Sequence, residues 1–264
     1  MDNRKLSAAK ILEEFAISSP DEIDINAIAQ FFGATVVAEP LHGSAARILG
    51  VGDRAFITVD SLSVRARQRF SAAHELGHWM MDRGRLSGFT CTEKQLVTGW
   101  SGDNPERRAN RFAADLLMPT YLFAPAAKNM EMTFNSVREL CQSFETSMTA
   151  TAIRLVEAGS FPAMVVCSTS SGIKWKSLPR DLPSAIELRD QPGKYTNAAE
   201  LLIGREAKVN PVEVEASDWL TTLRSKNYSI IEDSKLIYED TVLSLLWWKD
   251  ERQLIDLDAE EEEY

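Results

Sequence analysis

Apolar residues between residues 63 and 82 recur at the spacing of an α-helix. Val64, Phe70, Leu76 and Met80 offer apolar positions of a helical pattern, which predicts a helix over this stretch. Similar patterns predict further helices over 5–17, 25–32, 105–118, 135–143 and 148–158. Short runs rich in β-branched and apolar residues predict strands over 35–38 and 55–60.

Glycine, asparagine and proline mark the ends of these elements. Gly33 follows the helix over 25–32, where a left-handed residue ends a helix without strain. Asn104 and Pro105 have the residue types of an N-cap and a first helical position. The helix that they begin should stop before Pro119.

The pattern changes after Pro162. Apolar runs predict strands over 163–167, 173–175, 228–231 and 243–248, and helices are expected near 197–203 and 216–225. Such a mixture favours an α+β fold. We expect four parts, namely an N-terminal domain, a helical segment, a smaller C-terminal α+β domain and an acidic tail, over 1–125, 126–160, 161–250 and 251–264.

Composition restricts the classes of function. The net charge is −10, from 39 acidic and 29 basic residues, whereas nucleic-acid binders usually carry a basic surface. The three cysteines, Cys91, Cys141 and Cys167, are far apart and suggest neither a disulfide framework nor a cysteine zinc site. No N-terminal apolar signal is present and no apolar run is long enough to span a bilayer, so we expect a cytoplasmic protein.

Residues 74–78 read His-Glu-Leu-Gly-His, and two of the chain's three histidines fall in this frame. Side chains four residues apart share a helix face, so His74 and His78 can bind one zinc ion. Glu75 projects beside that face, where a carboxylate can take a proton from a zinc-activated water that attacks a peptide carbonyl. Gly77 costs about 1 kcal/mol relative to Ala inside a helix, which indicates a close approach by another group, such as a strand or a substrate.

A catalytic zinc site needs a third protein ligand and an open position. Asp82 is one turn beyond His78 and is poorly aimed at a metal held by the two preceding turns, so a supporting or solvent-facing role suits it better. Glu106, in the first turn of the next predicted helix, can close the site from a separate element. The alternatives are Glu93, Asp103 and Asp115. Zn²⁺ suits two histidines and a glutamate, although Mn²⁺ or Fe²⁺ can also occupy such a site.

Two segments, RQRFSAAHELGHWMMD and ERRANRFAADLLMP, resemble the paired motifs of the ImmA/IrrE family of metallopeptidases. The resemblance extends to about residue 159 and implies a zincin-like fold for 1–125 and a helix-turn-helix-like segment over 126–160. It also implies that Glu106 is the third ligand. Asn110, one turn further on, can support the site. Asp82 departs from the pattern, because many members have a histidine there.

The resemblance further implies a narrow substrate, a helix-turn-helix transcriptional repressor of the Cro/cI kind, whose cleavage relieves repression after stress. A second hypothesis is a regulatory protein that binds and sequesters a repressor or antitoxin without cutting it. The intact Glu75 argues against that alternative, since a purely structural zinc site does not need it.

Three assignments depend on residue type alone. Tyr121 and His42 are candidates for stabilising an oxyanion, because each can donate a hydrogen bond. Residues 135–158 hold more acids than bases, so we expect a scaffold or substrate-docking role for them and no direct binding of nucleic acid. The tryptophans of the C-terminal part are expected to build a core, with a ligand pocket as the alternative, and are Trp175, Trp219, Trp247 and Trp248.

Overall fold

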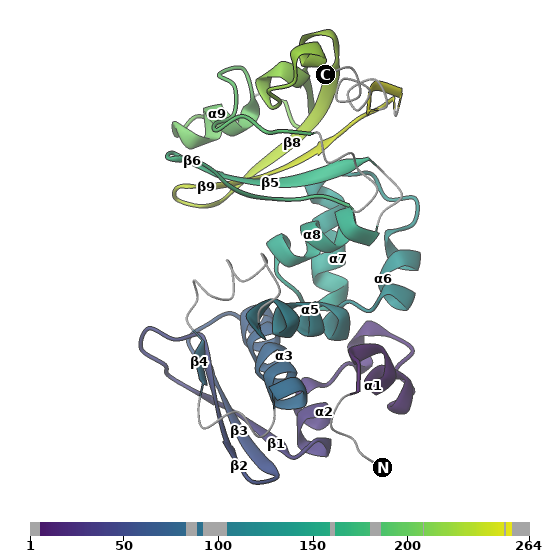
Figure 1. Cartoon of the computed structure of the whole chain (residues 1–264), viewed down its shortest axis with the longest axis vertical. Coiled ribbons are helices and arrows are strands. Elements are labelled where there is room, and N and C mark those ends of the chain that lie inside the picture. The colour runs from purple at the N-terminus through teal and green to yellow at the C-terminus, as the bar shows by residue number, and fades with distance from the viewer. Residues whose placement is uncertain are drawn as a thin grey trace, which may run out of the picture. The chain divides into compact units, whose positions relative to one another are not determined.

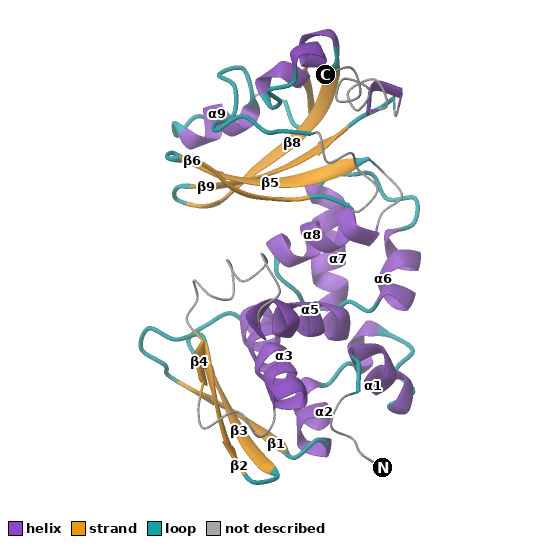
Figure 2. Ribbon diagram, viewed as in Figure 1, coloured by secondary structure: helices purple, strands orange, loops and turns teal. Residues whose placement is uncertain are grey.

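The computed structural model describes seven stretches of the chain, namely residues 6–82, 89–91, 105–158, 162–179, 186–207, 209–250 and 252–254. They form an α+β protein that divides into two compact units (Figures 1 and 2). Unit 1 comprises Met1–Ala126 with Leu140–Ser147, and unit 2 comprises Ala127–Glu139 with Met148–Tyr264. The helical segment expected over 126–160 is therefore shared between the two units.

Unit 1 contains a four-stranded mixed sheet in the order β1-β3-β2-β4. Its strands are β1 (Ala34–Glu39), β2 (Ala46–Val51), β3 (Arg54–Asp60) and β4 (Phe89–Cys91). β1 runs parallel to β3, whereas β2 is antiparallel to both β3 and β4. The inward side chains, such as Ile48 and Ile57, pack into the core of the unit.

The helices of unit 1 are α1 (Ala8–Glu14), α2 (Ile25–Phe31), α3 (Arg65–Asp82), α5 (Pro105–Leu117) and α6 (Thr120–Ala127). α3 packs on β2 and β3, and α2 packs on β1 (Figure 1). α5 crosses α3. Gly33 has a φ of 80° directly after α2, as expected for the end of a helix. Trp79 of α3 is buried and its indole donates to the carbonyl of Phe32 at 2.8 Å, which fixes the helix against the end of α2.

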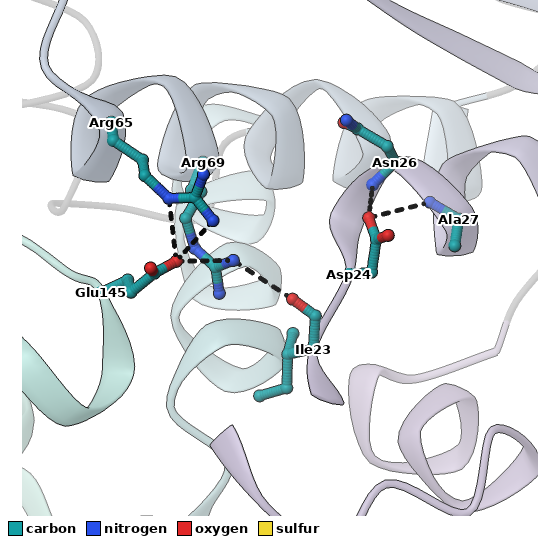
Figure 3. Close-up of polar contacts among 7 residues, drawn as sticks. All are labelled: Ile23, Asp24, Asn26, Ala27, Arg65, Arg69 and Glu145. Carbon is teal, nitrogen blue, oxygen red and sulfur yellow. Dashed lines mark hydrogen bonds and ion pairs between the residues drawn. The ribbon is translucent and has the colours of Figure 1, made fainter. Parts of the chain in front are cut away.

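Two arginines tie the start of α3 to the turn between α7 (Phe134–Phe144) and α8 (Met148–Ala158). Both ion-pair with Glu145, Arg65 at 3.0 Å and Arg69 at 3.2 Å, and Figure 3 shows the two guanidinium groups converging on one carboxylate. Arg69 also donates to the carbonyl of Ile23 at 3.2 Å. The first turns of α3 are thereby held to two other segments of unit 1.

Unit 2 is built on a five-stranded antiparallel sheet in the order β6-β5-β9-β8-β7. Its strands are β5 (Ala163–Thr169), β6 (Gly172–Ser177), β7 (Val212–Glu215), β8 (Ser229–Tyr238) and β9 (Thr241–Trp247). α9 (Asn197–Leu202) packs on β8 and β9, and α8 packs on β5 and β6. In Figure 1 these two helices lie on opposite faces of the sheet.

The tryptophans of unit 2 fall into two groups. Trp219 and Trp248 are buried in the core under α9, as expected for core aromatics. Trp175 and Trp247 are half-buried, and Trp247 lines a cavity of about 530 Å³ together with Met132 and Ile231. Core packing therefore accounts for two of the four tryptophans.

The second helix of the helix-turn-helix-like pair is largely buried. Thr151 to Val156 of α8 are buried without interruption, including Arg154. A helix that presents this little surface is poorly suited to enter a DNA groove. The scaffold or substrate-docking role expected for residues 135–158 stays a prediction. Among the described helices, none is both long and apolar enough to cross a membrane.

The predicted helix over 216–225 is wrong. The segment forms two 3₁₀ turns, η3 (Ala216–Asp218) and η4 (Leu223–Asn227). Between them, Trp219 O accepts from Arg189 N at 2.9 Å and Thr221 N donates to Glu187 O at 3.0 Å. These strand-like bonds use backbone groups that an α-helix would need internally.

Four strands or α-helices were not predicted: β2, β4, α6 and β7. The sequence contains a signal for β2, namely Gly52-Asp53, which forms the two-residue turn between the paired residues Val51 and Arg54. Gly-Asp between apolar runs is typical of a hairpin.

Candidate metal centre

The two histidines of the His-Glu-Leu-Gly-His segment lie one turn apart on α3, as predicted. His74, Glu75 and His78 are all fully buried. The Nε2 atoms of the two histidines are 3.1 Å apart, so both rings present the same nitrogen to one point. This arrangement follows from four-residue spacing on a helix.

Glu106 reaches the same point from the first turn of α5. Its Oε2 lies 3.3 Å from Nε2 of His74 and its Oε1 lies 3.4 Å from Nε2 of His78. Each of the three residues offers one ligand atom, and these atoms all lie within 4.8 Å of one another. The structure thus brings together the three residues that the sequence analysis selected as metal ligands.

Burial and mutual contact set the protonation of these groups. Burial lowers the pKa of His74, which favours the neutral imidazole that metals bind. Hydrogen bonds from His74 and His78 lower the pKa of Glu106 and keep its carboxylate charged. Two neutral imidazoles and one carboxylate form the donor set of a catalytic zinc site.

The distances also fit a metal. Ligand atoms at about 2.0–2.1 Å from a tetrahedral zinc lie about 3.3–3.4 Å from one another. The contacts among His74, His78 and Glu106 measure 3.1, 3.3 and 3.4 Å, and the two that involve Glu106 are made by different carboxylate oxygens. With one ligand atom from each residue inside 4.8 Å, the three side chains suit a metal ion such as zinc.

Asn110 contacts the far side of His74. Its Oδ1 lies 2.9 Å from Nδ1 of His74, and both side chains are buried. An acceptor at Nδ1 keeps the proton there and leaves Nε2 free to bind a metal. Asn110 is one turn beyond Glu106 on α5, so one helix supplies both the third ligand and the group that orients the first.

Gly77 is the point at which α5 crosses α3. A Cβ there would lie 3.1 Å from Cδ1 of Phe112 and 3.2 Å from Cα of Ala109. The close approach expected of Gly77 is therefore made by a helix, whereas the sequence suggested a strand or a substrate. The small residue at 109 was the missed signal, because Gly77 and Ala109 together let Glu106 come within reach of the histidines.

Among the remaining candidates, Asp115 is described and is not part of this cluster. Glu93, Asp103 and the side chain of Asp82 lie outside the part of the chain that the structure describes. Asp115 is on α5 and ion-pairs with Arg111 at 3.7 Å.

The two oxyanion candidates have other contacts. The hydroxyl of Tyr121 donates to the carbonyl of Ile17 at 2.8 Å, which ties α6 to the segment after α1. His42 is exposed between β1 and β2. The pKa of Asp60 is lowered mainly by the hydrogen bond from Leu41 N, and also by hydrogen bonds from Ser63 and Leu62. His42 adds a smaller electrostatic contribution in the same direction. Neither contact supports an oxyanion role.

A mixed sheet under a helix that carries His-Glu-x-x-His, with a glutamate from the next helix at the same point, defines a metallopeptidase-type domain. Residues 29–156 match the model of the IrrE N-terminal-like domain, Peptidase_M78, so this part of the chain carries that domain. The resemblance to the ImmA/IrrE family is thereby confirmed.

A solved structure with the same overall fold is a Mycobacterium tuberculosis transcriptional regulator. The two chains superpose with a TM-score of 0.58 at 15% sequence identity, over 90% of this chain and 85% of the other. At this identity the similarity concerns the fold alone. No curated protein matches the sequence.

Proposed function

We propose that this protein is a zinc-dependent endopeptidase with Glu75 as its general base. One observation carries the proposal: two imidazole nitrogens and a carboxylate from two helices converge at distances that suit one metal ion. A purely structural zinc site usually has four protein ligands, whereas the described residues supply three. A hydrolase needs a fourth coordination position that is left for a water molecule.

The roles of the residues follow from their positions. His74, His78 and Glu106 would hold the metal, and Asn110 fixes the ring of His74 through Nδ1. When bound, a zinc ion lowers the pKa of a coordinated water and polarises a carbonyl group. Glu75 takes up a proton at its carboxylate and can return it to the leaving amine. Its complete burial strengthens electrostatic interactions at the site.

The metal and the substrate are parts of the proposal. Zinc is the metal that this donor set suits best, and Mn²⁺ or Fe²⁺ are the alternatives. For the substrate we propose a helix-turn-helix repressor of the Cro/cI kind, supported by the match of residues 29–156 to the IrrE N-terminal-like domain. For the compartment we propose the cytoplasm, where such a repressor would act. The competing function is sequestration of a repressor or antitoxin without cleavage.

The first test is metal content, which needs no substrate. Wild-type protein should carry about one zinc per chain, and His78→Ala and Glu106→Ala should lose it. Glu75→Gln keeps all three ligands and should retain the metal. An empty wild type after loading with zinc, or normal binding by Glu106→Ala, would refute the ligand assignment.

Cleavage then separates the two functions. Zinc-loaded wild type and Glu75→Gln are each incubated with a small helix-turn-helix repressor of the Cro/cI kind, and the masses of the products are measured by mass spectrometry. We expect cleavage by wild type and intact substrate with Glu75→Gln. A stable complex without cleavage by either protein would favour sequestration.

A further inference from the structure

Ser71 is a buried polar residue on α3 for which the proposed mechanism has no use. It is fully buried, and its hydroxyl oxygen has no hydrogen-bond partner among the described residues. A serine inside a helix usually bonds to the carbonyl of the preceding turn. A buried hydroxyl without a partner costs about 1–3 kcal/mol, so its presence on the metal-binding helix calls for an explanation.

Helical spacing limits what Ser71 can serve. His74 is three residues on and Glu75 four residues on, which are the positions whose side chains neighbour Ser71 on the helix surface. Both ring nitrogens of His74 already have contacts, Nδ1 with Asn110 at 2.9 Å and Nε2 with Glu106 at 3.3 Å. His74 is therefore not an acceptor for this hydroxyl.

The preceding turn offers no better acceptor. The amide of Gln68, three residues before Ser71, donates to the carbonyl of Ser63 at 2.6 Å and is thereby turned toward the start of the helix. Arg67, four residues before, has only donors in its side chain. The Ser71 hydroxyl bonds to no backbone carbonyl among the described residues either. Among the side chains one turn away on the helix, the carboxylate of Glu75 is the acceptor that the spacing offers.

We propose that Ser71 is a positioning residue for Glu75, an inference that rests on the proposed function. Its O–H donates to one carboxylate oxygen of Glu75 when the site is in use. The bond directs the second oxygen toward the metal position and leaves it to accept the proton. Side chains in a helix lean toward its N-terminus, so Glu75 leans over the turn that contains Ser71.

The test uses acetohydroxamic acid, a probe that chelates a metal as its anion and releases a proton to a nearby base. Its affinity for the zinc-loaded full chain is measured by calorimetry for wild type, Ser71→Ala, Ser71→Thr, Glu75→Gln and the double variant Ser71→Ala/Glu75→Gln. Ser71→Ala should weaken binding about tenfold, the effect of losing one hydrogen bond to a charged group. Ser71→Thr keeps the hydroxyl and should restore the affinity.

The double variant shows whether Ser71 acts through Glu75. In the Glu75→Gln background, Ser71→Ala should have no further effect on affinity. Ser168→Ala is the matched control, because Ser168 is also fully buried with a hydroxyl lacking a partner among the described residues, but lies on β5. The affinity of Ser168→Ala for acetohydroxamic acid should equal that of wild type. The urea midpoint of metal-free Ser71→Ala should not fall, since the substitution removes a buried hydroxyl that has no partner.

Each other result overturns the inference. Binding by Ser71→Ala within twofold of wild type, or an equal loss in both backgrounds, would show that Ser71 does not act through Glu75. Loss of zinc by Ser71→Ala, or failure of Ser71→Thr to restore affinity, would show a merely structural role. If Glu75→Gln itself bound the probe normally, the assignment of Glu75 as base would fail and the role of Ser71 would fail with it.

Discussion

At the scale of single residues, the site depends on which nitrogen of His74 carries the proton. Asn110 contacts Nδ1 and Glu106 contacts Nε2, so the two ring nitrogens have different partners. An acceptor at Nδ1 selects the tautomer whose Nε2 can bind a metal. The asymmetry is built by α5 alone, since both partners lie on that helix.

Asn110→Ala should therefore weaken zinc binding by about ten- to a hundredfold, as is typical when such a supporting partner is lost. Asn110→Asp keeps an acceptor oxygen and should stay close to wild type. Competition with a chromogenic chelator measures both affinities. Wild-type affinity in Asn110→Ala would mean that the contact to Nδ1 does not orient His74.

Glu232 gives a pH-dependent prediction in unit 2. It is fully buried on β8, where Ala198 N donates to it at 2.7 Å and the indole of Trp219 at 3.4 Å. Burial raises the pKa of Glu232 above its usual 4.5 despite these bonds. The folded state therefore holds the proton more tightly than the unfolded state, and Glu232 costs stability as the pH rises above 4.5.

Glu232→Gln does not ionise, so it should gain stability relative to wild type as the pH rises from about 4 to about 7. Urea unfolding of both proteins at several pH values gives this difference in the free energy of unfolding. The change with pH is the informative quantity, because the fixed effect of replacing an oxygen by an amide cancels. A difference that stays constant or falls with pH would show that Glu232 does not titrate as described.

At the scale of elements, the crossing of α3 and α5 sets the position of the third ligand. Gly77→Ala would place a methyl group 3.1 Å from Phe112 and 3.2 Å from the backbone of Ala109. The two helices must separate by a few tenths of an ångström, which moves Glu106 away from the histidines. We expect zinc affinity to fall about tenfold, comparable with the loss of a supporting partner.

Gly52→Ala is a suitable control for this variant. A Cβ at Gly52 meets nothing within 4 Å, but its φ of 60° makes the substitution strained. It should lower stability without changing zinc affinity, as measured by the same chelator competition. Unchanged affinity in Gly77→Ala would show that the crossing tolerates the methyl group without moving Glu106.

The helices that carry the site could be predicted from the sequence, whereas their contact could not. The apolar period and the Asn-Pro start gave α3 and α5 to within a few residues. The approach of Glu106 to His74 depends on Gly77 and Ala109 meeting across two helices, which no local pattern contains. The segment over 216–225 failed for a related reason, because its backbone pairs with residues 187–189.

At the scale of the whole molecule, the metal residues lie in one unit. His74, His78 and Glu106 belong to unit 1, whereas the sheet with Glu232 belongs to unit 2. A ligand that binds only the folded state stabilises the part of the chain whose folding forms its site. The two units should therefore respond differently to removal of the metal.

Scanning calorimetry of the full chain, with zinc and after chelation, tests this difference. With zinc at about 100 times its dissociation constant, unit 1 should gain about 2.7 kcal/mol, and the transition of unit 2 should not move. Glu106→Ala identifies the transition of unit 1, because in that variant neither transition should respond to zinc. If both transitions of wild type shifted together, the two units would unfold as one cooperative body, and the metal on α3 and α5 would then stabilise the sheet of unit 2 as well.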